Sequence, residues 1–146
     1  MRILGIDFGD RTIGLALSDA LRLTAQPFGT YKPQGREEED RRFFRDLVAR
    51  HDVGEIVIGL PLRMDGTAGT RAEKTRQFGA WLERAVGLPI HFWDERLTTR
   101  EALSVLREQN VHGPRRKAAE DQVSAVIILA AYLERKRSEG DAAPDR

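Results

Sequence analysis

The chain has 146 residues, no cysteine and a formal net charge of +1, from 24 basic and 23 acidic side chains. This length suits one domain with a sizeable core, and the lack of cysteine excludes disulfides and thiolate metal sites. No apolar run approaches the length of a membrane span, and the N-terminus enters a strand instead of a signal peptide, so we expect a cytoplasmic protein. The balanced charge predicts that any nucleic-acid binding depends on a local basic patch.

The first expected elements are two strands, residues 2–7 and 13–18, joined as a hairpin by a turn that contains Gly9. Asp7 ends the first strand, directly after an apolar run. A carboxylate in such a run is costly to bury unless a cation compensates its charge. An acid that only starts a turn is the alternative. Asp7 is therefore the first candidate site residue.

The remaining elements alternate in the manner of an α/β domain with one central sheet. We expect strands within 23–31 and at 55–59 and 89–93, and helices over 37–51, 70–86, 98–109 and 117–136. Thr70 with Glu73, and Thr98 with Glu101, have the capping-box spacing that predicts a helix start. Residues 1–137 are expected to form a single domain, and residues 138–146 a disordered tail.

Three acids are expected where strand ends and a helix converge. Glu95, with Asp94 before it, follows the last strand, and ligands collect at the carboxyl ends of strands in open α/β sheets. Asp121 lies in the closing helix and aligns with Ala125 at helical spacing, so it points towards packed surface. An acid that complements the dipole of a helix N-terminus is the alternative for Asp121.

Together, Asp7, Glu95 and Asp121 suit Mg²⁺ or Mn²⁺, because these ions prefer oxygen ligands and no cysteine or paired histidine lies near the three acids in sequence. Such a cluster supports phosphodiester hydrolysis by two metal ions about 4 Å apart. Asp94 and Asp10 are candidate additional ligands, with turn positions as the alternative for both.

Residues 59–69 form a glycine-rich loop before a helix N-terminus, where N–H groups and the helix dipole favour a phosphate. We interpret the loop as a cradle for the substrate backbone, with Gly66 and Thr67 as contact residues; an ordinary connection is the alternative. Basic side chains elsewhere are candidates for phosphate contacts, with solvated surface positions as their alternative. They are Arg11, Arg96, Arg115, Arg116 and Lys117.

Over almost its whole length the sequence resembles the YqgF family, whose members are also called RuvX, pre-16S rRNA nucleases and Holliday-junction-resolvase-like proteins. The matching blocks are Gly5–Gly9 with Arg11–Ala16 and Ser18–Asp19, Ile58–Leu62 with Met64–Thr67, Asp94–Thr99, and Asp121 with Ala125 and Ile127–Leu129. The resemblance implies a ribonuclease-H-like fold, with a central mixed five-stranded sheet flanked by helices. It also matches Asp7, Glu95 and Asp121 to the acidic triad of the family. Ser124 stands where the family usually has alanine.

The same resemblance implies a metal-dependent nuclease that hydrolyses phosphodiester bonds in the 5′-end maturation of precursor 16S rRNA. One alternative is a Holliday junction resolvase of DNA recombination and repair, for which a symmetric dimer is expected because two strands must be cut. Another is a non-catalytic RNA-binding module of ribosome maturation, since a fold does not fix a function. RNA or DNA as substrate, endonuclease or exonuclease action, and a monomer or a homodimer are all compatible with the sequence.

Overall fold

The computed structural model describes residues 1–97 and 114–142, and within the last helix it describes the side chains of residues 122–139. The elements are β1 (Arg2–Phe8), β2 (Ile13–Ser18), β3 (Ala25–Tyr31), α1 (Glu37–Arg50), β4 (Val53–Leu60), α2 (Thr70–Val86), β5 (Ile90–Asp94), the short 3-10 helix η1 (Glu95–Leu97) and α4 (Pro114–Ala142). The five strands form one sheet in the order β3-β2-β1-β4-β5.

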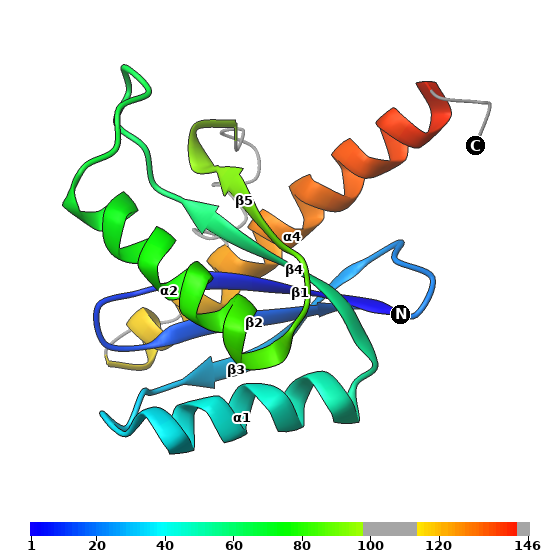
Figure 1. Ribbon diagram of the computed structural model, residues 1–146. Coiled ribbons are helices and arrows are strands. Elements are labelled where there is room, and N and C mark those ends of the chain that lie inside the picture. The colour runs from blue at the N-terminus through cyan, green and yellow to red at the C-terminus, as the bar shows by residue number, and fades with distance from the viewer. Residues whose placement is uncertain (98–113, 143–146) are drawn as a thin grey trace.

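The sheet is mixed, as expected from the resemblance. β2 pairs antiparallel with both β1 and β3, whereas β4 pairs parallel with both β1 and β5. The carboxyl ends of β1, β4 and β5 therefore meet at one edge of the sheet, which we call the carboxyl edge (Figure 1). Asp7 and Asp94 both lie at this edge.

Helices cover both faces of the sheet (Figure 1). On one face, Leu4 and Ile6 of β1 pack in a core that includes Phe44 of α1 and Leu82 of α2. On the other face, Ile3 of β1 belongs to a second core, which includes side chains of β4, β5 and α4. Because successive strand residues point to opposite faces, each strand contributes to both cores.

The expected strands and the two helices of the first core are confirmed, with small shifts at their ends. The capping box at Thr70 and Glu73 is wrong: α2 has Gly69 as its N-cap, with an extended backbone and no side-chain cap, and Thr70 is already helical. α4 begins at Pro114, before the expected residue 117, because proline fits the first turn of a helix. It continues to Ala142, into the expected tail. The helix expected over 98–109 lies outside the described residues.

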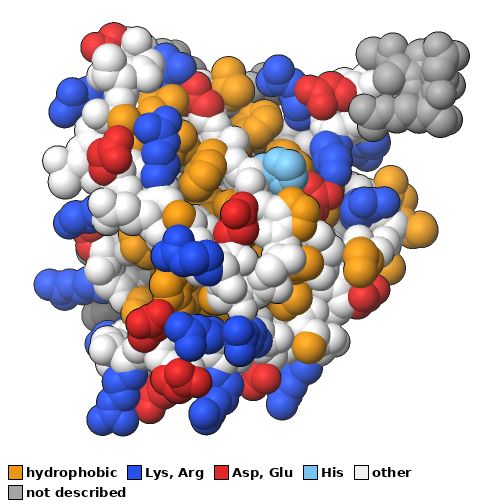
Figure 2. All heavy atoms as spheres, viewed as in Figure 1, with side chains coloured by type: hydrophobic (Ala, Val, Ile, Leu, Met, Phe, Trp, Pro, Cys, Tyr) orange, Lys and Arg blue, Asp and Glu red, His pale blue; other side chains and the backbone are white. Residues whose placement is uncertain are grey.

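Two surface findings bear on partners. On the face that carries α1 and α2, basic and acidic side chains are interspersed rather than gathered into a single basic patch (Figure 2). The helices are also too short or too polar to cross a membrane, in the part of the chain that the structure describes.

A buried carboxylate joins α4 to the sheet at the end opposite the carboxyl edge. Glu55, near the start of β4, accepts hydrogen bonds from the Tyr132 hydroxyl at 2.7 Å and the Lys136 ammonium at 2.6 Å. His91 Nε2 of β5 lies 3.4 Å from the same carboxylate. Burial alone would raise the pKa of Glu55, but the hydrogen bonds from Lys136 and Tyr132 outweigh it and hold the pKa below its ordinary value.

We expect Glu55→Gln to lower the free energy of unfolding at pH 7 by about 1–3 kcal/mol, because it removes a charged acceptor of two hydrogen bonds. A lowered pKa in the folded state contributes stability above the ordinary glutamate pKa, and this contribution is lost as the pH falls. Urea unfolding at pH 7 and near pH 3.5 should therefore show a difference from wild type that shrinks in acid. Glu139→Gln, at an exposed position of α4, is the control with little effect. Equal effects of the two substitutions would contradict the role of Glu55.

Candidate active site

The carboxyl edge places two of the three predicted acids on the face that α4 covers. Ile3 belongs to the core under α4, and a Cβ atom on Gly5 would lie 2.7 Å from Leu129 Cβ of α4. Strand alternation therefore puts Asp7, two residues after Gly5, on the same face. Asp7 is half-buried and pairs with Gly14 of β2 in the strand register.

Glu95 reaches this face through a space left by a glycine at the end of β4. A Cβ atom on Gly59 would lie 3.2 Å from the Glu95 carboxyl carbon and 2.5 Å from Ile128 Cδ1 of α4. A side chain at position 59 would therefore displace the Ile128 side chain and crowd the Glu95 carboxylate. Glu95 thus follows β5 in the chain and begins η1, but its carboxylate lies against β4, the strand between β5 and β1.

The surroundings of Glu95 favour a cation. Burial raises the pKa of Glu95, the nearby Asp94 carboxylate raises it further, and the Arg71 guanidinium acts in the opposite direction. The net pKa is above the ordinary glutamate value. A cation beside this carboxylate would favour its charged form and offset the cost of burying it.

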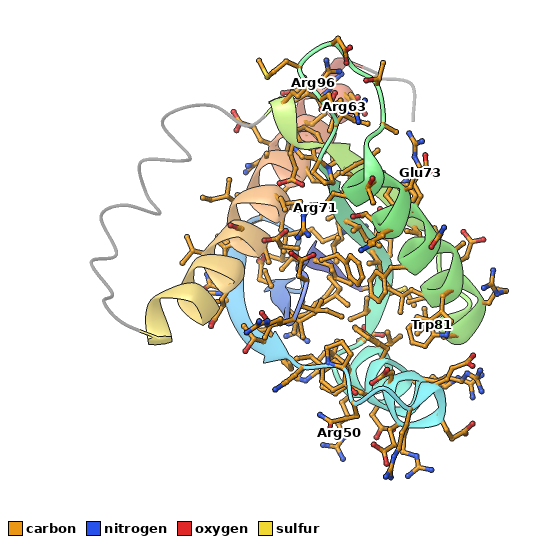
Figure 3. The ribbon with its side chains drawn as sticks, turned by 90° about the vertical axis from the view of Figure 1, so that its left-hand side faces the viewer. Arg50, Arg63, Arg71, Glu73, Trp81 and Arg96 are labelled. Carbon is orange, nitrogen blue, oxygen red and sulfur yellow. The ribbon has the colours of Figure 1, made fainter. Side chains whose placement is uncertain are left out.

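Arg71, in the first turn of α2, is a residue of this edge that the sequence analysis missed. Its Nη2 donates a hydrogen bond to the Phe8 carbonyl oxygen at 3.0 Å, and its Nη1 pairs with the Asp10 carboxylate. The side chain accordingly links α2 to the end of β1 (Figure 3). A basic side chain in the first turn of a helix interacts unfavourably with the helix dipole. This unfavourable position is the one feature of the sequence that could have indicated a specific partner for Arg71.

Arg96 holds Asp94 and the loop after β4 together. Its Nε donates to Asp94 Oδ1 at 3.0 Å, its Nη2 to Asp94 Oδ2 at 2.7 Å, and its Nη1 to the Met64 carbonyl oxygen at 3.2 Å. The hydrogen bonds from Arg96 lower the pKa of Asp94. Asp94 and Asp10, the candidate additional metal ligands, are thus both ion-paired with arginines.

The loop of residues 61–69 is an ordered turn. The Gly66 N–H donates to the Arg63 carbonyl oxygen at 2.8 Å, and the Asp65 carboxylate accepts from the Thr67 N–H at 2.9 Å and the Thr67 hydroxyl at 2.7 Å. Arg63 and Arg96 both lie at this loop (Figure 3), and Met64 beside them is 89% exposed. The N–H groups of Gly66 and Thr67, interpreted above as part of a phosphate cradle, are therefore already used within the loop.

The other predicted residues are placed in part. Asp121 lies in α4 one turn before Ala125, whose carbonyl oxygen would lie 3.1 Å from a Cβ atom on Gly5. The Asp121 side chain is outside the described residues, as are the side chains of the predicted basic residues of α4, Arg115, Arg116 and Lys117. Arg11 is exposed in the turn between β1 and β2. Among the described residues, which exclude the Asp121 side chain, no three His, Cys, Asp or Glu side chains form a group that could hold a metal ion.

Comparison of the whole chain with known proteins gives consistent matches. A family model described as RuvX, Holliday junction resolvase, matches residues 1–135. A Lachnospira eligens protein named "Putative pre-16S rRNA nuclease" is 47% identical over 139 residues, covering 94% of this chain and 99% of that protein. A Koribacter versatilis protein of the same name is 47% identical over 135 residues, covering 92% of this chain and 88% of that protein.

A solved structure supports the expected ribonuclease-H-like fold. RuvC of T. thermophilus, in complex with a Holliday junction substrate, matches with a TM-score of 0.58 at 18% identity. The match covers 93% of this chain and 96% of that chain. At this identity the similarity concerns the fold alone.

We expect Glu95→Gln to raise the melting temperature at pH 7 in EDTA by a few degrees, because it removes a charge whose burial is unfavourable. A carboxyl whose pKa is raised in the folded state costs no stability below its ordinary pKa, so the gain should vanish near pH 4. Thermal unfolding at the two pH values measures this, and Mg²⁺ should raise the melting temperature of the wild type more than that of the variant. Glu73→Gln, exposed on α2, is the matched control. A variant less stable than wild type at pH 7 in EDTA would contradict this account.

Proposed function

Because the chain belongs to the RuvX family, we propose that it is a divalent-metal-dependent nuclease that hydrolyses phosphodiester bonds of precursor 16S rRNA and matures its 5′ end. The main observation behind the proposal is that the Glu95 carboxylate lies against Gly59. Asp7 lies at the same edge of the sheet and on the same face. The names of relatives at 47% identity supply the substrate. A ribosomal RNA precursor as substrate places the protein in the cytoplasm.

The proposed metal ligands are Asp7, Glu95 and Asp121. This donor set consists of carboxylate oxygens, and because burial raises the pKa of Glu95, a nearby cation would favour its charged form, which fits Mg²⁺ or Mn²⁺. Two such ions, when bound, supply an activated water and compensate the charge of the leaving oxygen. The backbone of α4 supports the third ligand, because Ala125 packs against Gly5 and residue 121 lies one turn nearer the start of that helix.

The basic residues of the chain have two proposed roles. Arg11, with Arg115, Arg116 and Lys117 at the start of α4, would bind substrate phosphates by charge. Arg96 would also contact the substrate, but Asp94 already compensates most of its charge, and its hydrogen bonds to Asp94 and Met64 fix the loop beside the site. Gly66 and Thr67 would then contact the substrate through the surface of that loop rather than through their own N–H groups.

Cleavage of a Holliday junction is the second candidate function, because the matching family model is described as a Holliday junction resolvase. It requires a homodimer that presents two sites symmetrically, whereas rRNA processing is compatible with a monomer. A precursor rRNA fragment carrying the mature 5′ end and a four-way DNA junction should be compared as substrates, each with Mg²⁺, Mn²⁺ or EDTA. We expect faster cleavage of the RNA, and only with metal. Faster cleavage of the junction would favour the resolvase, and binding without turnover would favour the non-catalytic module.

We expect Asp7→Asn to abolish cleavage while the protein stays folded, because the substitution removes a metal-ligating charge at nearly constant volume. Cleavage rates at saturating Mg²⁺ and circular dichroism measure the two effects. Asp46→Asn, on the exposed side of α1, is the matched control and should retain full activity. A folded Asp7→Asn protein with full activity would overturn the assignment.

The same assay tests Asp121. Ligands of a shared pair of ions act as one unit, so adding Asp121→Asn or Glu95→Gln to Asp7→Asn should cost little further activity. Independent, multiplying losses would show separate roles. Full activity of the single Asp121→Asn variant would show that Asp121 is not a metal ligand, and its role would then be to complement the dipole at the helix N-terminus.

Salt dependence tests the basic start of α4. Phosphate contacts release counterions, so replacing Arg115 and Arg116 by alanine should reduce the slope of log affinity against log salt by about 1.5. Binding to the RNA fragment in Ca²⁺ or EDTA, at several salt concentrations, measures the slope. Arg50→Ala with Arg84→Ala, exposed near the far ends of α1 and α2, is the control with no change. An unchanged slope in the Arg115 and Arg116 variant would show that neither residue contacts substrate phosphates.

A further inference from the structure

An aromatic pocket lies on the face of the sheet opposite the proposed metal site. It has a volume of about 450 Å³ and is lined by residues that include Phe8, Tyr31, Glu37, Asp40, Phe78 and Trp81. These residues come from β1, the end of β3, and helices α1 and α2. Trp81 lies on α2 beside α1 (Figure 3).

Three rings of the pocket are nearly parallel. Phe8 and Phe78 stack with centroids 4.5 Å apart at 17°, and Phe78 and Trp81 follow at 5.9 Å and 28°. A planar aromatic ligand can continue such a stack, because offset stacking is a favourable arrangement of aromatic rings. Base stacking on aromatic side chains is also the common way in which proteins hold single-stranded nucleic acid.

Two carboxylates supply acceptors in the same pocket. Glu37 Oε1 accepts from Trp81 Nε1 at 3.3 Å and pairs with Arg41 Nη2 at 2.8 Å. Asp40 Oδ1 accepts from the Tyr31 hydroxyl at 2.5 Å and the Gln34 N–H at 3.1 Å. These contacts all use one oxygen of each carboxylate. Since Arg41 already compensates the charge of Glu37, a ligand with neutral N–H donors suits the pocket better than a cation.

The pocket lies close to the proposed site. Phe8 follows Asp7 in β1, and successive Cα atoms of a chain are about 3.8 Å apart. The side chains of Asp7 and Phe8 point to opposite faces of the sheet, at its carboxyl edge. A strand with one phosphate at the metal site can therefore pass over the edge and turn a neighbouring base towards the rings.

We propose that the pocket receives an unstacked guanine base of the substrate strand, close to the cleaved bond. This proposal rests on the proposed nuclease function. Guanine presents two adjacent N–H donors on its Watson–Crick edge, which match a carboxylate acceptor. Adenine, cytosine and uracil each have only one donor group on that edge, so none of them presents two adjacent N–H donors to a carboxylate. Guanine continues the stack at Trp81, and the second carboxylate oxygen of Glu37 accepts from its N–H groups.

The test follows the Trp81 indole N–H signal by NMR in EDTA, during titration with 5′-GMP, 5′-AMP, 5′-CMP or 5′-UMP. We expect 5′-GMP to bind about tenfold more tightly than the others, as a good carboxylate–base pair discriminates by roughly this factor. Glu37→Gln should abolish the preference while the protein stays folded. Glu38→Gln should keep it, because Glu38 is in the same turn of α1 and also pairs with Arg41, but does not line the pocket.

Equal affinities for the four nucleotides, or no shift of the Trp81 signal, would overturn the proposal. A shift of that signal by L-arginine methyl ester at lower concentration than by 5′-GMP would also overturn it, and would assign the pocket to a basic side chain of a protein partner. The titration needs no cleavage. A GMP preference without nuclease activity would therefore contradict the proposed function alone, and nuclease activity without the preference would contradict the pocket alone.

Discussion

The contact between α4 and the sheet is the constraint on which the site depends. Two glycines allow it: a side chain at Gly5 would collide with Leu129, and one at Gly59 with Ile128. Small residues let a helix backbone approach a strand closely, and here the two glycines bring α4 close to β1 and β4 at these two positions. The space that remains at the end of β4 is where the Glu95 carboxylate lies.

The buried carboxylates at the two ends of this interface differ in how far the protein compensates their charge. At the start of β4, Glu55 is satisfied by the protein itself, through Tyr132 and Lys136. At the carboxyl edge, Glu95 is left with a raised pKa, because the charge of Arg71 does not offset its burial. In the proposed mechanism, stability and function thus separate along α4, since one carboxylate fixes the helix and the other retains the capacity to gain from a cation.

Sequence patterns predicted the sheet well, because it depends on local periodicity. The rule that parallel strands share an edge also predicted that Asp7 and the residues after β5 lie at one edge, whereas the role of the three acids stays a prediction. Sequence patterns failed where partners lie far apart in the chain. Arg71 was missed because its partners, Phe8 and Asp10, precede it by more than 60 positions. Arg96 was read only as a phosphate ligand, although it holds Asp94 and the Met64 carbonyl oxygen. The capping box was wrong because Gly69 takes the extended cap conformation and leaves Thr70 inside the helix.

The same ion pairs bear on how a polyanion approaches the edge. Asp10 and Asp94 are paired with Arg71 and Arg96, so these two arginines bring little uncompensated positive charge. Asp7 and Glu95 add negative charge beside them. A phosphate chain brought to this edge meets the Glu95 carboxylate, whose repulsion Arg71 and Arg96 do not offset. In the proposed mechanism, divalent cations therefore serve binding as well as hydrolysis, because they reverse the charge of the surface that the scissile phosphate must touch.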